Sequence, residues 1–161
     1  MIFYYKYNIT TNDIFIIEKD NFITHLLYRG FVPTGKTEKE TPLIKETFSQ
    51  LSEYFEGKRK IFEIPIKPEG TEFQKKVWEQ LLKVPYGKTK TYKELAESVD
   101  SPKACRAVGL ANNKNPISII IPCHRIIGSN GKLVGYAGGL DTKKFLLNLE
   151  RDNSATNNRL F

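Results

Sequence analysis

The sequence predicts an α/β (α+β) fold. A small N-terminal subdomain of sheet plus helix precedes a mainly helical C-terminal subdomain with a helix-turn-helix and a short hairpin. Three observations predict it: aromatic and β-branched segments alternate with turn residues near the N-terminus, apolar residues recur at helical spacing in the second half, and residues 65–70 hold two prolines and a glycine. We therefore expect three parts: a scaffold subdomain at 1–68, a second domain at 69–153 and a flexible tail at 154–161.

The first subdomain is expected to start with three strands. Aromatic and β-branched segments are separated by the turn pairs Asn12-Asp13 and Asp20-Asn21, which predicts a small antiparallel meander. The strand segments are residues 2–7, 14–18 and 22–28.

A polar loop is expected at residues 32–41. Apolar residues at three- and four-residue intervals then predict an amphipathic helix over 43–55, which Gly57 ends. Residues 61–64 have the composition of one more short strand. No cluster of polar side chains in this half suggests catalysis, so we expect it to act as a scaffold.

Two capping boxes begin the helices of the second domain. Thr71 with Gln74, and Thr91 with Glu94, have the spacing at which side chain and backbone cap each other. Trp78, on the apolar face of the first of these helices, is expected in the core.

A third helix is expected from about residue 103 to 112, with Ser101 as N-cap and Pro102 at its first position. With the preceding helix it forms a helix-turn-helix. Its small side chains would let its backbone approach another surface closely; they are Ala104, Ala107, Gly109 and Ala111. Close packing against a neighbouring helix explains them equally well, so the pattern alone leaves DNA recognition open.

The next feature is a thiol beside an imidazole. Ile119 to Ile121 predict a short buried strand, and Pro122 ends its regular pairing. Cys123 follows, with His124 and Arg125 next to it. An imidazole or a cation favours the thiolate, which is the nucleophilic form of cysteine. A lone cysteine after an apolar run is, however, more often a small buried hydrophobe, so the pair alone is weak evidence of catalysis.

After the thiol we expect a hairpin and a final helix. Residues 128–131 have hairpin-turn chemistry between strands at 126–127 and 133–134. Asp141 is expected to cap a helix that reaches Glu150.

Charge and cysteine content narrow the class of protein. The chain of 161 residues has a net charge of +7, of which residues 1–68 carry +1 and residues 69–161 carry +6, as expected if the second domain meets phosphates. Neither a long apolar run nor a charged-then-apolar leader is present, so we expect a cytoplasmic (intracellular) protein with no membrane contact. Two cysteines without a CxxC pair predict neither a disulfide framework nor a zinc site.

Residues 122–126 (Pro-Cys-His-Arg-Ile) resemble the active-site signature of the O6-alkylguanine-DNA alkyltransferases, also called methylated-DNA–protein-cysteine methyltransferases. The resemblance covers about residues 71–151. The positions that match functional residues of the family are Tyr92, Arg106, Asn115, Cys123, His124, Arg125, Tyr136 and Glu150.

The resemblance implies direct reversal of DNA damage by a DNA-binding alkyltransferase domain at 69–153. An alkyl group, mainly methyl, would pass irreversibly and stoichiometrically from O6 of guanine, or by extension O4 of thymine, to Cys123. The base would be flipped from the minor groove of double-stranded DNA, because an O6 group inside the duplex cannot meet a thiol. The residues implied in DNA binding are Arg106, Ala104, Ala107, Gly109 and Arg125.

The resemblance also implies roles around the thiol. Glu150 would orient His124, which would take the proton of Cys123 through a water, and Tyr92 would donate to guanine N3. The implied pocket residues are Asn115, Ile126, Val134, Tyr136, Ala137 and Lys143. No cofactor, no metal and no obligate protein partner is implied, and a monomer is expected.

Three alternatives stay open at this point. A related non-catalytic module binds alkylated DNA but lacks the cysteine, a plain helix-turn-helix module would make the Cys-His pair incidental, and a Cys-His hydrolase would turn over. Val134 stands where other members have Gly, and we expect it to narrow the pocket so that methyl groups transfer faster than benzyl groups.

Overall fold

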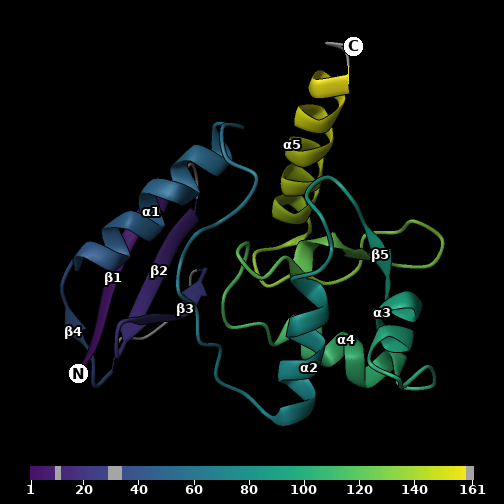
Figure 1. The fold of residues 1–161 in the computed structure, drawn as a ribbon, viewed down its shortest axis with the longest axis horizontal. Coiled ribbons are helices and arrows are strands. Elements are labelled where there is room, and N and C mark those ends of the chain that lie inside the picture. Colours follow the sequence, from purple (N-terminus) through teal and green to yellow (C-terminus); the bar gives the residue numbers. More distant parts are fainter. Residues whose placement is uncertain (10–11, 29–33, 159–161) are drawn as a thin grey trace. The chain divides into compact units, whose positions relative to one another are not determined.

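The computed structural model describes residues 1–9, 12–28 and 34–158 (Figure 1). The chain forms two compact units, one of residues 1–69 with 116–118 and the other of residues 70–115 with 119–161. The sequence prediction assigns residues 116–118 to the second domain. They belong to the first unit because the backbone N–H of Leu26 donates to the carbonyl of Pro116 at 2.9 Å, and that of Ser118 to the carbonyl of Leu26 at 3.1 Å.

The first unit contains a four-stranded sheet in the order β3-β2-β1-β4. The predicted antiparallel meander is confirmed by β1 (Ile2–Ile9), β2 (Asn12–Lys19) and β3 (Phe22–Leu27). Asp20 and Asn21 turn the chain between β2 and β3 with φ of 51° and 67°, a region that Asp and Asn tolerate better than most residues. The strand β4 (Thr37–Glu38), parallel to β1, lies inside the predicted loop, whose residues 32–33 fall outside the described part of the chain.

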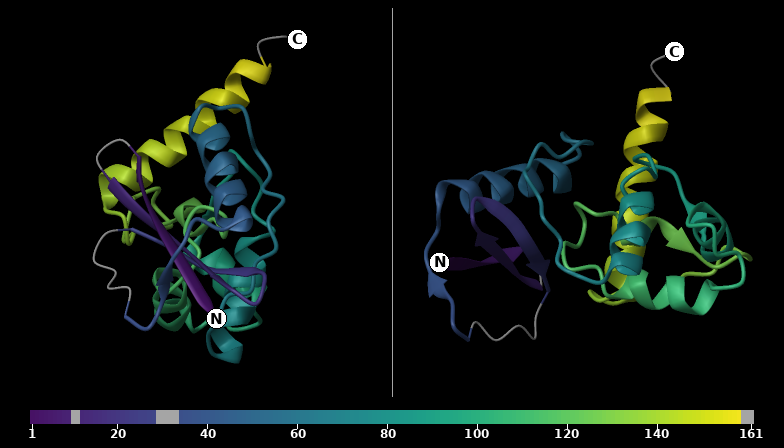
Figure 2. Two further views of the ribbon diagram at one scale, coloured as in Figure 1. Left: turned by 90° about the vertical axis from the view of Figure 1, so that its left-hand side faces the viewer. Right: turned by 60° about the horizontal axis from the view of Figure 1, so that its bottom comes forward.

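One helix, α1 (Pro42–Phe55), packs on a face of this sheet (Figures 1 and 2). Thr41 caps it, because its Oγ1 accepts from the N–H of Ile44 at 3.1 Å. The strand predicted at residues 61–64 is wrong. That segment is irregular, and only Ile66 forms an isolated parallel bridge, to Ile23.

The second unit begins with the two predicted capped helices, α2 (Glu72–Leu81) and α3 (Tyr92–Ser98). Both capping boxes are present, so the local sequence determines where these helices start. Trp78 is 1% exposed, and its Nε1–H donates to the carbonyl of Ala111 at 2.9 Å, which confirms the core position.

The helix α4 (Cys105–Asn113) packs against α2 and α3. It starts later than predicted, and the expected Ser101 cap is wrong. Ala104 stands at the cap position without a side-chain hydrogen bond, while the Ser101 hydroxyl donates to the carbonyl of Val99 at 3.3 Å. Residues 101–104 therefore form a turn between α3 and α4.

The predicted strand at Ile119 to Ile121 is also wrong. These residues are buried, but Ile119 has a φ of 72°, which a β-branched side chain rarely adopts, and the chain turns there. Cys123–Arg125 then form the short 3₁₀ helix η1.

The predicted hairpin after η1 is present only as its turn. The N–H of Gly131 donates to the carbonyl of Gly128 at 2.9 Å, but residues 133–134 form no strand. The strand β6 (Ile126–Ile127) instead pairs in parallel with β5 (Lys90–Thr91).

The last helix, α5 (Leu140–Asn158), is longer than predicted. Asp141 lies in its first turn rather than at its cap, and the tail expected from residue 154 is helical through Asn158, with residues 159–161 outside the described part of the chain. None of the described helices has the length and apolar character needed to span a membrane.

Candidate active site

Cys123 lies at the start of η1 and is 5% exposed. Two asparagines hold the chain around it. The Asn115 side chain donates through Nδ2 to the carbonyl of Ile121 at 2.7 Å, and Asn112 Nδ2 lies 3.4 Å from the carbonyl of Cys123. The thiol therefore occupies a fixed position in the second unit.

Burial raises the pKa of the Cys123 thiol to about 11, although a hydrogen bond from Asn115 and the charge of Lys143 oppose the rise. At neutral pH the resting group is a thiol, which is a poor nucleophile. Chemistry at this sulfur therefore needs a base.

His124 is completely buried and lies 2.7 Å from Glu150, measured from Nε2 to Oε2. A carboxylate only accepts hydrogen bonds, so this contact assigns the imidazole proton to Nε2 and leaves a lone pair on Nδ1. Among the described residues, Nδ1 has no hydrogen-bond partner. Burial lowers the pKa of His124, so its neutral form, which can act as a base, is favoured.

The carboxylate of Glu150 accepts hydrogen bonds from His124, Arg125 and Gly87. Besides His124, Arg125 donates through Nε at 2.8 Å and Nη2 at 3.0 Å, and the backbone N–H of Gly87 donates at 3.1 Å. Burial favours the protonated carboxyl, but the hydrogen bonds from His124 and Arg125 outweigh it and lower the pKa of Glu150 to about 2. Glu150 is therefore charged and fixed in orientation at neutral pH.

Arg125 is a correction to the predicted DNA-binding set. Its side chain is buried, with Nη1 donating to the carbonyl of Val84 at 2.7 Å and the guanidinium 5.7 Å from the centre of the Tyr86 ring. Together with the two-bond pair to Glu150, these contacts occupy the guanidinium inside the unit. It is not at a surface where it could meet a phosphate.

Tyr92 and Lys143 meet at the loop that follows β6. The Tyr92 hydroxyl donates to the carbonyl of Val134 at 2.8 Å, and Lys143 Nζ lies 3.0 Å from the same oxygen. Lys143 Nζ also donates to the carbonyl of Ile126 at 2.6 Å. Burial and the nearby Cys123 thiol raise the pKa of Tyr92, so its hydroxyl keeps its proton and can donate.

Two of the predicted pocket residues lie further along this loop. Tyr136 is half-buried, and its carbonyl accepts from the N–H of Gly139 at 3.0 Å, while Ala137 is exposed. Val134 is 51% exposed. The loop therefore presents Val134 and Ala137 to solvent while its carbonyls face Tyr92 and Lys143.

The helix α4 exposes Arg106 and Ala107, two of the residues predicted to bind DNA. Ala104 is half-buried, and Gly109 faces the Tyr92 ring, where a Cβ atom would lie 3.7 Å from the ring carbons. The pattern of small residues therefore reflects helix packing at Gly109 and an open surface at Ala107. Leu110, not predicted from the sequence, is 59% exposed on the same helix.

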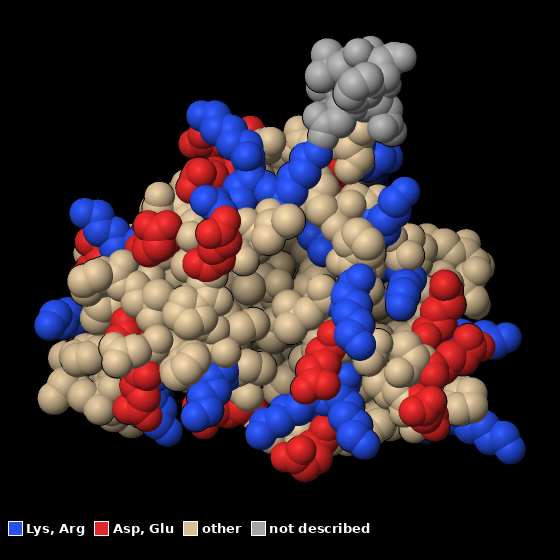
Figure 3. Space-filling model, viewed as in Figure 1, with Lys and Arg blue, Asp and Glu red and all other residues tan. Residues whose placement is uncertain are grey.

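Charges of both signs are mixed on one face of the molecule (Figure 3). On the face drawn in Figure 3, the described Lys and Arg side chains alternate with Asp and Glu side chains rather than gathering in one basic patch.

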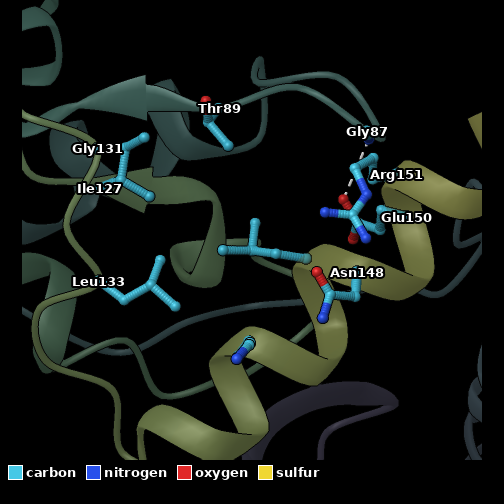
Figure 4. A pocket seen from close by; sticks show the side chains of 10 residues that line it. Gly87, Thr89, Ile127, Gly131, Leu133, Asn148, Glu150 and Arg151 are labelled. Atoms are coloured by element: carbon cyan, nitrogen blue, oxygen red, sulfur yellow. Dashed lines mark hydrogen bonds between the residues drawn. The ribbon is translucent and has the colours of Figure 1, made fainter.

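A cavity of about 390 Å³ is lined by Glu150 but not by Cys123. Figure 4 shows Ile127, Gly131 and Leu133 on one side, facing α5 residues that include Asn148 and Glu150. In residues 1–9, 12–28 and 34–158, no group of three or more His, Cys, Asp or Glu side chains could hold a metal ion.

Asn112 and Gly87 join the site without having been predicted. Asn112 lies near the end of α4, three residues before Asn115, so the two asparagines close together before the Cys123 motif were a usable signal. Gly87 contributes only its backbone N–H, which no sequence pattern identifies.

Two protein-family models match this chain. One, described as "6-O-methylguanine DNA methyltransferase, DNA binding domain", matches residues 72–152. The other, described as "6-O-methylguanine DNA methyltransferase, ribonuclease-like domain", matches residues 2–68.

Known proteins are similar along the same regions. A protein of Methanosarcina barkeri named methylated-DNA–protein-cysteine methyltransferase is 62% identical over 109 residues, which are 68% of this chain and 69% of that protein. The crystal structure of the Mycobacterium tuberculosis O6-methylguanine methyltransferase has a TM-score of 0.88 at 38% identity, covering 95% of this chain and 94% of that one. A crystal structure of Mycobacterium tuberculosis OGT in complex with DNA has the same TM-score of 0.88 and 38% identity, covering 94% of each chain.

Proposed function

We propose that this chain, which belongs to the 6-O-methylguanine DNA methyltransferase family, repairs DNA by transferring a methyl group from O6 of guanine to its own Cys123. The observation that carries the proposal is the buried Cys123, next in sequence to an imidazole whose Nε2 is bonded to Glu150 at 2.7 Å and whose Nδ1 is unpartnered among the described residues. This arrangement provides a nucleophile, a base and a group that orients the base.

The first step is removal of the thiol proton. Because the pKa of Cys123 is raised to about 11, the neutral imidazole of His124 takes the proton at Nδ1, directly or through a water. Glu150 stabilises the imidazolium that forms, and Arg125 keeps that carboxylate charged.

The thiolate of Cys123 then attacks the methyl carbon in line with the bond between that carbon and O6 (the C–O6 bond). The S–C bond forms as the C–O6 bond breaks, and the bonding electron pair leaves with guanine. A proton from Tyr92 to N3 of the base neutralises that charge, and the proton taken up by His124 restores the tyrosine. A thioether is not cleaved by water, so each molecule reacts once.

Access to the thiol requires a change in the loop of residues 133–137. Cys123 is 5% exposed, and the Tyr92 hydroxyl is engaged by the carbonyl of Val134. We expect a bound base to displace this contact. The freed Tyr92 hydroxyl can then donate to N3 of the base. Tyr136 packs over the base, and the N–H of Ala137 is directed at O6.

DNA meets the protein at α4. The exposed Arg106 and Ala107 lie on that helix, and Mycobacterium tuberculosis OGT, whose crystal structure is in complex with DNA, has a similar fold at a TM-score of 0.88. The α3–α4 pair acts as a helix-turn-helix that enters the minor groove, and Arg106 fills the space of the flipped nucleotide, since its planar cation can stack where a base was. The protein acts as a monomer in this proposal, and a DNA substrate places it inside the cell.

A methylated duplex tests the proposal. The wild-type protein is incubated with an excess of oligonucleotide carrying O6-methylguanine and then analysed by intact mass and peptide mapping. We expect one added methyl group per molecule, located on Cys123, and an equal amount of repaired guanine.

Variants and substrates separate the alternatives. Cys123→Ser should show no transfer, while Cys105→Ser, which removes the exposed cysteine of α4, should react like the wild type. Binding without an adduct would instead indicate a non-catalytic module for alkylated DNA, and repeated turnover would indicate a hydrolase. A duplex with O4-methylthymine, tested in parallel, determines whether that base is also a substrate.

A further inference from the structure

Lys143 of α5 is completely buried, and its ammonium is held by three backbone carbonyls. Nζ lies 2.6 Å from the oxygen of Ile126, 3.0 Å from that of Val134 and 3.3 Å from that of Gly135. An ammonium has three N–H donors, so these contacts use all of them and fix the charge at one point.

This buried cation has no carboxylate partner among the described residues. The buried ion pairs of this unit join Glu150 to His124 and Arg125, and none includes Lys143. A buried charge without a counter-charge is costly, and hydrogen bonds to carbonyl dipoles offset that cost only in part.

The charged and titratable groups around Lys143 leave one candidate counter-charge. The positive charge of Arg125 is matched by Glu150, and burial favours the neutral form of His124. The Tyr92 ring lies 6.0 Å from Nζ and keeps its hydroxyl proton. The remaining described group beside Lys143 that can become an anion is the thiol of Cys123. Lys143 Nζ donates to the carbonyl of Ile126, whose own backbone N–H donates to the carbonyl of Cys123. Burial lowers the pKa of Lys143, and the charge of Cys123 opposes that change.

We propose that Lys143 is a positioning residue whose buried positive charge, fixed by three carbonyls, is the counter-charge of the Cys123 thiolate. His124 removes the proton, and Lys143 stabilises the anion that results. The same three hydrogen bonds connect β6 and residues 134–135 to α5. They therefore fix the Lys143 charge in position relative to the predicted pocket residues Ile126 and Val134. The catalytic consequence rests on the proposed function, whereas the electrostatic pairing does not.

Thiol reactivity tests the pairing without DNA. In a Cys105→Ser background, so that one thiol remains, the rate of Cys123 alkylation by iodoacetamide is measured between pH 6 and 11 for three proteins. These are the unaltered background, Lys143→Met and Lys144→Met, the last removing the exposed neighbouring lysine of the same helix.

We expect Lys143→Met to move the reactivity profile at least about one pH unit higher, so that the rate near pH 8 falls about tenfold. Lys144→Met should leave the profile unchanged. Equal profiles for Lys143→Met and the background would overturn the proposal, as would an equal shift in Lys144→Met.

A second measurement covers the case in which Lys143→Met does not fold. The Lys143 side chain is titrated by NMR in the wild type and in Cys123→Ser. Because coupling between two sites is reciprocal, loss of the thiolate should make Lys143 release its proton at lower pH. Identical Lys143 titrations in the two proteins would overturn the proposal. The wild type could fail to accept a methyl group from DNA while Lys143→Met shifts the reactivity profile and Cys123→Ser shifts the Lys143 titration. That result would refute the proposed function but not the pairing of Lys143 with Cys123.

Discussion

Replacing Glu150 with Gln removes the one negative charge that both His124 and Arg125 contact. The substitution keeps the side-chain shape but leaves the buried guanidinium of Arg125 without a counter-charge, which costs about 3–5 kcal/mol in comparable buried pairs. The pKa of Glu150 gives a similar figure. A carboxyl that titrates at about 2 when folded and near ~4.3 when unfolded contributes about 3 kcal/mol to the free energy of unfolding at pH 7.

The sign of the pH dependence follows from that lowered pKa. The contribution of Glu150 is complete above the pKa of the unfolded chain and is lost as the pH falls from about 5 toward 2. Urea unfolding of the wild type and of Glu150→Gln at several pH values measures it. We expect a difference of about 3 kcal/mol at pH 7 that shrinks steadily below pH 5.

A double-mutant cycle provides the control. Arg125→Met alone leaves the Glu150 charge without its two-bond partner, whereas Arg125→Met with Glu150→Gln removes both charges, so the double variant should lose less stability than the two single losses together. Strict additivity, or a Glu150→Gln protein that unfolds at the wild-type urea concentration at pH 7, would refute this reasoning.

Three further substitutions give separate tests. Gly87→Ala should lower the free energy of unfolding by about 1–3 kcal/mol, because Gly87 has a φ of +77° and a Cβ atom would lie 2.2 Å from the Ser154 hydroxyl oxygen; an unchanged urea midpoint would contradict this. Thr71→Ala should cost about 1 kcal/mol by urea unfolding, since it removes the acceptor at 3.1 Å from the N–H of Gln74, and no loss would show that this cap is dispensable. Val134→Gly should raise the rate of benzyl transfer relative to methyl transfer in single-turnover assays, whereas the same ratio in both proteins would remove Val134 from the determinants of substrate size.

The parts of the fold that could be predicted depend on neighbouring residues. The boxes at Thr71 and Thr91 mark helix starts because cap and partner are three residues apart. The turn at Asp20 and Asn21 likewise defines the β2–β3 connection locally. Such signals lie within a few residues of one another, so they predict the local structure independently of the rest of the chain.

The predictions were wrong where hydrogen-bond partners are distant in sequence, or where a buried irregular segment has the apolar composition of a strand. The Ile119 to Ile121 run is buried, but its conformation depends on a positive φ that composition does not reveal. The strand β4 has only two residues and pairs with β1, which is distant in sequence. So short a segment shows no alternation of apolar and polar residues from which a strand could be predicted.

The candidate site divides in the same way. Cys123 and His124 are adjacent, so the sequence alone suggested a nucleophile and a base. Arg125 was misassigned to DNA because its partner Glu150 lies 25 residues away on α5, and the ion pair exists only in the folded chain. Lys143 was expected in the pocket, but its burial and its three carbonyl contacts depend on how α5 packs.

The most direct test of the account follows two atoms of the lesion. A duplex is prepared in which the methyl carbon of O6-methylguanine is ¹³C and its O6 is ¹⁸O, and it is reacted with one equivalent of protein. We expect all the ¹³C to appear as an S-methyl group on Cys123 while the ¹⁸O stays in the repaired guanine. Release of ¹³C-methanol, a label on any other residue, or loss of ¹⁸O from the base would contradict this expectation.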